Sequence, residues 1–595
     1  DLGLLAAVAG VDDDEALRAV EDARRAKLVD EVDGVLDRWR FAHALVQETL
    51  LEELTTSRRI RMHERVVRAL ERSFGTAPGP HLVVLAHHAS EAAAAGNTVR
   101  AAEYALLAAE HVLQRFGYEE AARLCTIGLE ALDLGADDRP LRCKLLLVRG
   151  DAYDWVGDRR ADKDLDAATA MSRDLEGHPR LYAEAMVRSF ALLPGRYDAP
   201  MVRQLRDALA RLPDDEIDLR ATLHGMLAAA TSFGEPRQTA QAHARQALEL
   251  ASRARDTELA GLAIYFASFP SAVSGETRYA DQILDLFRGV VGPLEMPARS
   301  MRTVALCARC DLGGARDELQ RLRQVVEEIP AAMGRYAVLV FESTLATVEG
   351  RFRDASRSGR EAGVVAGEMF RSVYGDLATL TPAMAAMPRL RWQGRSAELV
   401  PFTEAAAGSL PGVGWRAALA AVLADVGRLD DAAELLEELS KDRFGGFAPQ
   451  ALAYGVDRYS IALAIEAAAA VGHQGWLREL SDLLEPAAAL ASVLAYGPAP
   501  VQWIGSCHLF LGIAARALAE NAAAESHLRS ALDIHEREGA RPLAAQTRYE
   551  LALSLRESGD PASRAEASSH ARVALAVADD LGLAVLRRRL DEADL

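Results

Sequence analysis

Glycine-centred breaks recur along most of this chain at intervals of roughly 40 residues, and apolar residues follow helical spacing between them. The breaks lie at Gly117, Gly157, Gly195, Gly234, Gly275, Gly313, Gly350, Gly394, Gly427, Gly472 and Gly559. Alanine and leucine, which favour helix, dominate the stretches between them. This period fits one helical hairpin per repeat. Because a single hairpin cannot bury its apolar face alone, the sequence predicts an all-α solenoid with a concave groove.

Several repeats carry small and aromatic residues at the positions of the tetratricopeptide pattern. We expect Gly150 to let its partner helix approach closely and Tyr153 to fill the space beside it. Further matches are Leu146 and Gly157; Ala121, Cys125 and Gly128; Leu511, Gly512, Ala515, Ala524, Leu528 and Ala531; and Ala567, Ala571 and Ala574. The fold predicted is therefore a superhelix similar to that of tetratricopeptide proteins. Between residues 181 and 400 most signature residues are lost, so the register of that stretch stays open.

The chain begins differently, with two short helical patterns, a hairpin and a third helix. Asp12 to Glu15 place acids in the first turn of the second helix, where the helix dipole favours them. Asp33-Gly34 is a turn signal, Trp39 to Phe41 suits a strand, and apolar residues then follow helical spacing from Leu45 to Leu54. This order predicts a small winged-helix module over residues 1–75.

The run Arg40-Phe41-Ala42-His43-Ala44-Leu45-Val46 resembles the end of the ATPase core in bacterial STAND signalling proteins, which include maltose-activator-like, LuxR-type and cyclase-linked regulators. The stretches 496–498, 511–531, 538–542 and 546–548 resemble the tails of the same proteins. The resemblance implies that the winged helix closes over a bound nucleotide and that His43 contacts its phosphates in the resting form. The alternative for His43 is that it caps or packs the junction between hairpin and helix.

The resemblance also implies a division of the chain and a function. Residues 1–75 would be the winged helix, 76–180 the first repeats, 181–400 the degenerate repeats of a sensor arm, and 401–595 the C-terminal repeats. The arm would bind a small-molecule inducer or a partner protein and control nucleotide-dependent activation and homo-oligomerisation. A constitutive scaffold for protein-protein interaction is the alternative.

No cofactor is expected to bind within this chain itself. A phosphate-cradling loop needs Gly-Lys-Ser or Gly-Lys-Thr, and no lysine of this sequence follows a glycine. ATP or ADP would therefore bind an ATPase domain upstream, in a longer protein. Neither a catalytic constellation nor a zinc pattern is present, and the adjacent His87 and His88 point to different helix faces.

Charge and cysteine usage restrict the partners and the compartment. A net charge of -19 argues against nucleic-acid binding by the repeats, because phosphate contacts need clustered cations. The cluster from Arg58 to Arg68 favours a DNA-binding winged helix only weakly, since a solvated helix face explains it more simply. Five scattered cysteines indicate a cytoplasmic protein, with Cys307 and Cys310 as buried thiols.

An uncharged run from residue 486 to 515 is interrupted by Gly497-Pro498, which leaves pieces too short to cross a bilayer. We expect this run to form buried repeat helices, and we expect no association with a membrane.

Aromatic side chains gather in one region of an otherwise aromatic-poor chain. This region predicts a ligand surface for a small molecule or peptide, because rings offer large contact areas at low entropic cost. Its members are Phe444, Phe447, Tyr454, Tyr459, Trp476, Tyr496 and Trp503. Core packing between repeats is the commoner role for such rings. A weaker second candidate comprises Tyr265, Phe266, Phe269 and Arg278 around Gly275.

Overall fold

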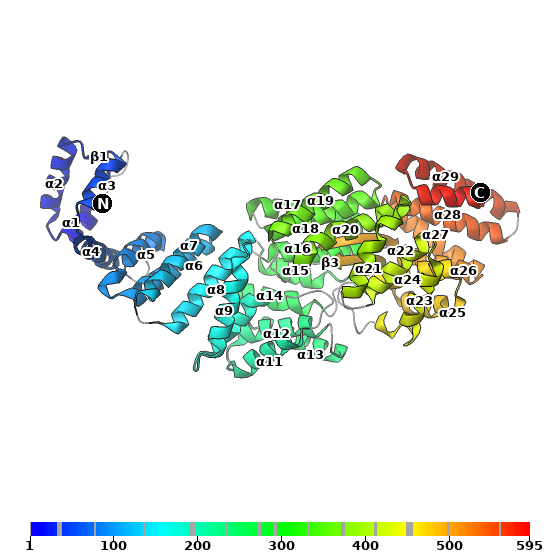
Figure 1. Cartoon of the computed structure of the whole chain (residues 1–595), viewed down its shortest axis with the longest axis horizontal. Coiled ribbons are helices and arrows are strands. Elements are labelled where there is room, and N and C mark those ends of the chain that lie inside the picture. The colour runs from blue at the N-terminus through cyan, green and yellow to red at the C-terminus, as the bar shows by residue number, and fades with distance from the viewer. Residues whose placement is uncertain are drawn as a thin grey trace. The chain divides into compact units, whose positions relative to one another are not determined.

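The computed structural model describes residues 2–32, 38–75, 79–135, 137–190, 198–232, 235–269, 275–288, 294–329, 332–369, 375–409, 413–447, 456–496, 499–558 and 561–594. The chain divides into two compact units, Asp1–Ser189 and Phe190–Leu595. Apart from two short β-hairpins, the regular elements of the described residues are helices (Figure 1). The predicted all-α solenoid is therefore confirmed.

The first unit opens with the predicted order of elements. Its start consists of α1 (Leu2–Ala9), α2 (Asp13–Arg25), β1 (Val29–Glu31), β2 (Trp39–Phe41), α3 (Ala44–Glu52) and α4 (Thr56–Phe74). The carboxylate of Asp12 accepts a hydrogen bond from the backbone N–H of Glu15 and so caps α2. Strands β1 and β2 pair antiparallel. The predicted turn at Asp33-Gly34 lies outside the described residues, and the winged-helix assignment stays a prediction.

Helical hairpins make up the rest of the first unit. The helices are α5 (Leu82–Glu91), α6 (Thr98–Leu113), α7 (Tyr118–Asp133), α8 (Arg139–Val156), α9 (Arg160–Arg173) and α10 (Pro179–Ser189). In α8 a Cβ built on Gly150 would lie 2.7 Å from the side chain of Leu165 in α9. The close helix approach predicted at this glycine is therefore confirmed.

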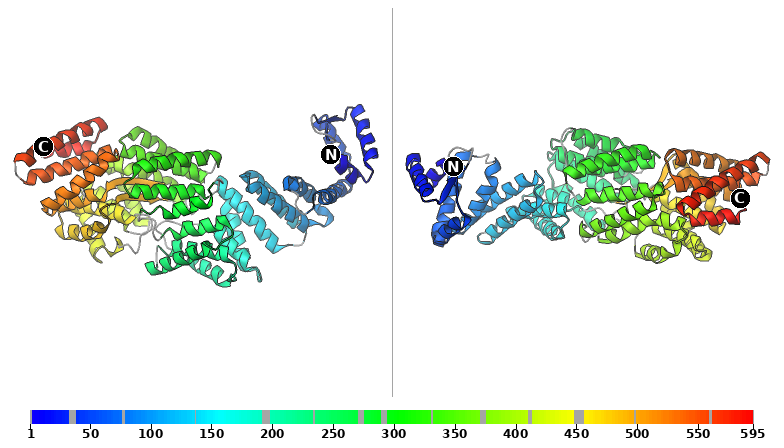
Figure 2. Two further views of the ribbon diagram at one scale, coloured as in Figure 1. Left: turned by 180° about the vertical axis from the view of Figure 1, so that it is seen from behind. Right: turned by 90° about the horizontal axis from the view of Figure 1, so that it is seen from above.

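The second unit continues the pattern with longer stacks of paired helices, which Figure 2 shows from two further sides. The helices are α11 (Ala199–Arg211), α12 (Ile217–Thr231), α13 (Arg237–Ala251), α14 (Thr257–Ala267), α15 (Arg278–Leu286), α16 (Glu295–Ala308), α17 (Leu312–Glu328), α18 (Ala332–Val348), α19 (Phe352–Met369), α20 (Gly375–Trp392), α21 (Val400–Ser409), α22 (Gly414–Asp425), α23 (Leu429–Ser440), α24 (Val456–Val471), α25 (Gln474–Leu484), α26 (Cys507–Ala517), α27 (Asn521–Arg537), α28 (Arg541–Ser558), α29 (Pro561–Leu581) and α30 (Ala584–Glu592). Gly512 of α26 repeats the role of Gly150, since its Cβ would lie 2.6 Å from Leu528 of α27.

Most of the predicted glycine breaks within the described residues are turns. Gly157, Gly350, Gly394, Gly427 and Gly472 end helices with positive φ angles, which glycine adopts without strain. The prediction at Gly313 is wrong, because this residue lies in the first turn of α17. The breaks predicted at residues 195, 234 and 559 lie outside the described residues.

The uncharged run contains a β-hairpin, so the prediction of buried repeat helices is wrong for the strands and is confirmed for residues 507–515, which belong to α26. Strand β3 (Ala491–Tyr496) pairs antiparallel with β4 (Ala499–Ser506) before α26 begins. Val493, Val501 and Ile504 are β-branched and favour strand. The described residues contain no helix that is long and apolar enough to cross a membrane.

The hairpin lies against helices that precede it by more than 100 residues (Figure 1). The indole N–H of Trp503 donates to the carbonyl oxygen of Cys307 in α16 at 3.0 Å. The hydroxyl of Thr344 in α18 donates to the carbonyl oxygen of Val501, also at 3.0 Å. These bonds give the buried indole N–H of Trp503 and the backbone carbonyl of Val501 partners on the helices. The hairpin thus forms part of the interior of the second unit.

Candidate functional site

A cavity of about 260 Å³ lies within the second unit. Alternate helices α20, α22, α24, α26, α28 and α30 line it, and β4 contributes Gln502 and Ile504. On α24 the lining residues Tyr459, Leu463 and Glu466 follow helical spacing along one face. The cavity is therefore enclosed by alternate helices of the stack.

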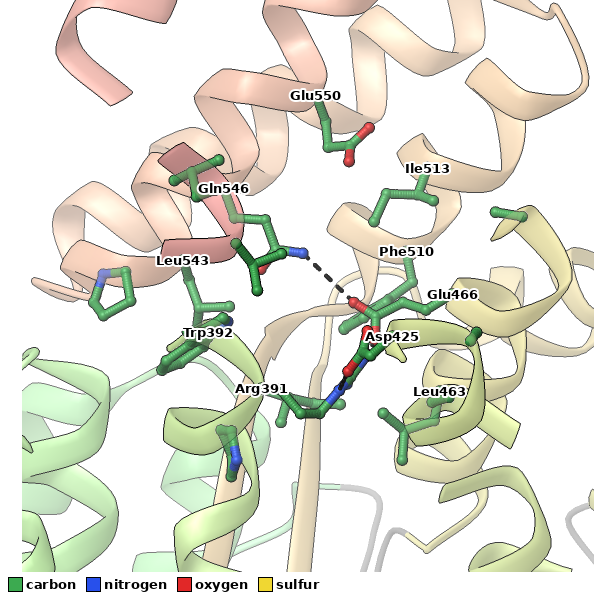
Figure 3. Close-up of a pocket in the computed structure, with 18 of the residues that line it drawn as sticks. Arg391, Trp392, Asp425, Leu463, Glu466, Phe510, Ile513, Leu543, Gln546 and Glu550 are labelled. Atoms are coloured by element: carbon green, nitrogen blue, oxygen red, sulfur yellow. Dashed lines mark hydrogen bonds and ion pairs between the residues drawn. The ribbon is translucent and has the colours of Figure 1, made fainter. Parts of the chain in front are cut away.

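Most of the cavity wall is apolar. The apolar side chains Trp392, Phe510, Ile513 and Leu543 (Figure 3), together with Leu586, come from four helices and surround a few polar groups. Pockets of this composition are typical of small-molecule sites, in which the polar groups fix the orientation of the ligand.

Arg391 of α20 joins two carboxylates on one side of the cavity. Its guanidinium donates to both oxygens of Asp425, at 2.6 and 3.2 Å, and to one oxygen of Glu466 at 2.8 Å. Figure 3 shows the three side chains converging from α20, α22 and α24. Burial lowers the pKa of Arg391, but the two facing carboxylates outweigh it and raise the pKa well above its usual value. This group, which we call the acidic pole, carries one more negative than positive charge.

Glu466 has a second, much weaker partner. The side-chain amide of Gln546 in α28 donates to its other oxygen at 3.5 Å, the outer limit of a hydrogen bond (Figure 3). An ionised carboxylate offers about four acceptor positions. Glu466 therefore retains acceptor capacity toward the cavity.

A second charged group lines the cavity from α26, α28 and α30. Arg516 contacts one carboxylate oxygen of Glu550 at 3.0 Å. Arg589 also lines the cavity, and the described residues contain no acid in an ion pair with it. We call Arg516, Glu550 and Arg589 the basic pole, because their charges sum to one positive.

The structure separates the aromatic residues that the sequence groups together. Tyr459 lines the cavity and donates its hydroxyl to Gln502, and burial raises the pKa of this phenol. Trp503, Phe444 and Phe447 are each at most 1% exposed and belong to the core. The rings of Phe444 and Phe447 stack on each other with centroids 5.9 Å apart. Trp476 is partly exposed and stacks on His473, away from the cavity lining.

Two members of that group are not described at the level of their side chains. Tyr454 lies outside the described residues, as does the side chain of Tyr496, whose backbone ends β3. Among the rings of the predicted ligand surface that the structure describes, the ring of Tyr459 lines the cavity.

The weaker candidate around Gly275 is an aromatic cluster within the second unit. The ring of Phe266 contacts those of Tyr265 and Phe269 at centroid distances of 5.1 and 6.0 Å. Burial raises the pKa of Tyr265 to about 12. Arg278 lies 4.7 Å over the neighbouring Tyr279 ring. These contacts are those of a packed cluster.

His43 is exposed at the start of α3, and its side chain makes no capping hydrogen bond there. His88 approaches His63 of α4 with their Nδ1 atoms 2.9 Å apart, whereas His87 is exposed. The described residues contain no cluster of histidine, cysteine or acidic side chains that could hold a metal ion. All five cysteines are buried, which confirms the prediction for Cys307 and Cys310.

The charged residues of the cavity were missed by reasoning from the sequence, although the sequence contains a signal for them. Glu466 is the one charged residue between Arg458 and Arg478, and Arg516 is the one charged residue between Glu485 and Glu520. A lone charge inside an apolar helix must find a partner or face a cavity. Both residues do so here.

No family model and no curated protein matches this sequence. Among solved structures, the Cut9-Hcn1 assembly of the APC/C matches at 13% identity and a TM-score of 0.43, covering 99% of this chain and 98% of that chain. A STAND protein with a tetratricopeptide repeat sensor from Pyrococcus horikoshii matches at 11% identity and a TM-score of 0.28, covering 65% and 60%. A Rap protein complexed with Competence and Sporulation Factor matches at 12% identity and 0.25, covering 81% and 99%. At these values the likenesses support no inference about function.

Proposed function

We propose that this chain is the sensor region of a STAND-type signalling ATPase or transcriptional regulator. The cavity among the alternate helices of the second unit carries this proposal, because it combines apolar walls with two charged poles and so suits a ligand. An inducer bound there would bias a nucleotide-dependent switch in an ATPase domain upstream. The resemblance of the N-terminal motif and of the C-terminal stretches to STAND proteins supports this assignment.

Helix α3 supplies the surface for contact with the ATPase domain. It contains no buried residue, although its sequence is rich in leucine. Leu45 is 74% exposed, Leu50 44% and Leu51 42%, and Phe41 beside them is 40% exposed. With 3.6 residues per turn these leucines point to different sides of α3, so the helix exposes apolar side chains around its whole circumference. Soluble proteins rarely leave so much apolar surface uncovered, and we assign α3 to a contact with the ATPase domain, which would surround it in the closed state.

The energy available from this contact is of the right order for a switch. Burying the exposed parts of the three leucines contributes about 2–5 kcal/mol. Moving a two-state equilibrium almost fully from one state to the other needs about 5.5 kcal/mol. Burial of all sides of α3 would therefore supply a large part of the closed-state stability, and nucleotide contacts such as that proposed for His43 would supply the remainder.

The experiment is ADP retention and basal signalling in the longer protein that contains the proposed ATPase domain. We expect His43→Ala to weaken ADP retention and to raise basal activity. His87→Ala is a matched control, because His87 is also an exposed histidine of the first unit. Unchanged ADP retention and unchanged basal activity in the His43 variant would refute the switch and favour the alternative function, a constitutive scaffold for protein-protein interaction.

A further inference from the structure

We infer that the cavity binds a small amphipathic zwitterion of the apolar amino-acid class, with its ammonium group on Glu466 and its carboxylate on Arg589. This inference rests on the proposed sensor function and names the ligand class of that site. It follows from the distribution of charge around the cavity, the hydrogen-bonding capacity left on its polar groups, and the volume of the cavity.

The distribution of charge favours a ligand with both signs. At the acidic pole Asp425 and Glu466 share one guanidinium, and at the basic pole Arg516 and Arg589 face one lining carboxylate. The lining as a whole is neutral, so a ligand with one net charge would leave one pole uncompensated. A zwitterion compensates both poles at once.

The acidic pole has room for an ammonium group. Asp425 is occupied by Arg391 and by the hydroxyl of Ser396, which donates at 3.0 Å. Glu466 instead keeps one oxygen whose contact is the long bond from Gln546. Displacing this bond costs little, because its length is at the limit of hydrogen bonding. The freed amide of Gln546 then offers its own oxygen to the three donors of an ammonium group.

The basic pole has a cation available for a carboxylate. Arg516 is engaged by Glu550 at 3.0 Å and approached by Glu557 at 3.7 Å. Arg589 comes from α30 and has no such partner among the described residues. Its guanidinium fork matches a carboxylate in shape and donor spacing. Arg589 is therefore the residue of this pole that can accept a ligand anion without breaking an existing ion pair.

The volume fits a ligand of amino-acid size. The cavity's 260 Å³ corresponds to roughly eight or nine water volumes, and leucine contains about nine non-hydrogen atoms. The rest of the wall includes Trp392, Phe510, Ile513 and Leu543, which suit the aliphatic or aromatic side chain that projects from the charged end of such a ligand. These walls disfavour a ligand that is polar along its whole length.

The test is calorimetric titration of the intact chain with L-leucine, 3-methylbutylamine and 4-methylpentanoate as probes of the same apolar body. We expect leucine to bind, and the amine and the acid to bind at least tenfold more weakly, because each lacks one charge-assisted hydrogen bond. Equal binding of all three probes would overturn the zwitterion assignment. Absence of binding by leucine and by phenylalanine, used as a larger probe, would overturn the inference as a whole.

Two variants and one control test where in the chain the ligand binds. Arg589→Gln should reduce leucine affinity to that of 3-methylbutylamine and leave the affinity of the amine unchanged. Glu466→Gln should weaken leucine and the amine equally. Arg588→Gln is the matched control on the same helix, because Arg588 is absent from the cavity lining and pairs loosely with Glu592 at 3.7 Å. If leucine affinity is unchanged in both Arg589→Gln and Glu466→Gln, the site is refuted even though the ligand binds.

Failure of this inference is distinguishable from failure of the proposed function. If leucine binds in the cavity without changing ADP retention in the longer protein, the proposed switch is refuted and the proposed ligand class is retained. If His43→Ala loses ADP retention and the amino-acid probes do not bind, the proposed switch is retained and the proposed ligand class is refuted.

Discussion

Arg391 holds the acidic pole together, so its replacement should destabilise the second unit strongly. In Arg391→Met the carboxylates of Asp425 and Glu466 lose the cation that they share. Removing one partner of a buried ion pair costs about 3–5 kcal/mol. The three side chains here retain 16–19% exposure, which lets water relieve part of the penalty. We therefore expect a loss near the lower limit, about 3 kcal/mol, in urea-induced unfolding.

Two further variants decide whether uncompensated charge is the cause. Combining Arg391→Met with Asp425→Asn and Glu466→Gln removes every charge, and it should recover stability to within about 1–2 kcal/mol of the original chain. Arg395→Met breaks a pair whose members are about half exposed, at 51% and 53%, and should leave the stability almost unchanged, because solvent screens such a pair. The reasoning is refuted if Arg391→Met costs no more than Arg395→Met, or if the triple variant is less stable than the single one.

Three further predictions test the packing of α26 on α27, the buried histidine His535 and the exposed helix α3. Gly512→Ala should cost about 1–3 kcal/mol in chemical unfolding because its Cβ would overlap Leu528, whereas the equally helical Gly408, with nothing within 4 Å, should tolerate alanine or gain stability. Burial lowers the pKa of His535 to about 3 from 6.5, so the unfolded chain binds the extra proton between these values, and the free energy of unfolding should fall on acidification by about 1.4 kcal/mol per pH unit. Burial also lowers the pKa values of His88 and His224, which contribute to the slope in both proteins. In urea unfolding from pH 7 to pH 4, His535→Gln should therefore make the slope shallower by up to this amount; an equal slope in both proteins would contradict the assignment. Leu45→Ser should change the stability of this chain by less than about 0.5 kcal/mol, because Leu45 is 74% exposed. The same variant should weaken ADP retention in the longer protein. Retention equal to that of the original protein would contradict the proposed contact between α3 and the ATPase domain.

Local pattern was sufficient to predict the repeats. Gly150 and Gly512 each allow a close contact within one hairpin, 15 and 16 residues from Leu165 and Leu528. Packing of this kind depends on residue size at short sequence separation, which a sequence displays directly. The turns at Gly157 and Gly427 follow from the same local chemistry, since positive φ favours glycine.

The β-hairpin and the cavity depend on contacts between distant segments, which a single sequence does not display. Strand β4 lies against α16, α18 and α20, and Gln502 donates to the carbonyl oxygen of Met384 at 2.5 Å. The cavity requires α20 and α30, roughly 200 residues apart, to lie on the same side of the stack. Among the described aromatic residues that the sequence groups together, Tyr459 lines the cavity, whereas the charged residues that give the cavity its chemistry became apparent through the fold.

The measurement that tests the central claim most directly is amide hydrogen exchange of the intact chain with and without saturating L-leucine. Exchange reports which helices a ligand stabilises, independent of any assumption about its pose. The proposed site predicts slower exchange in α24, α28 and α30, which supply Glu466, Gln546 and Arg589, and unchanged exchange in α6 to α9. Protection confined to other helices, or no change in any helix, would contradict it.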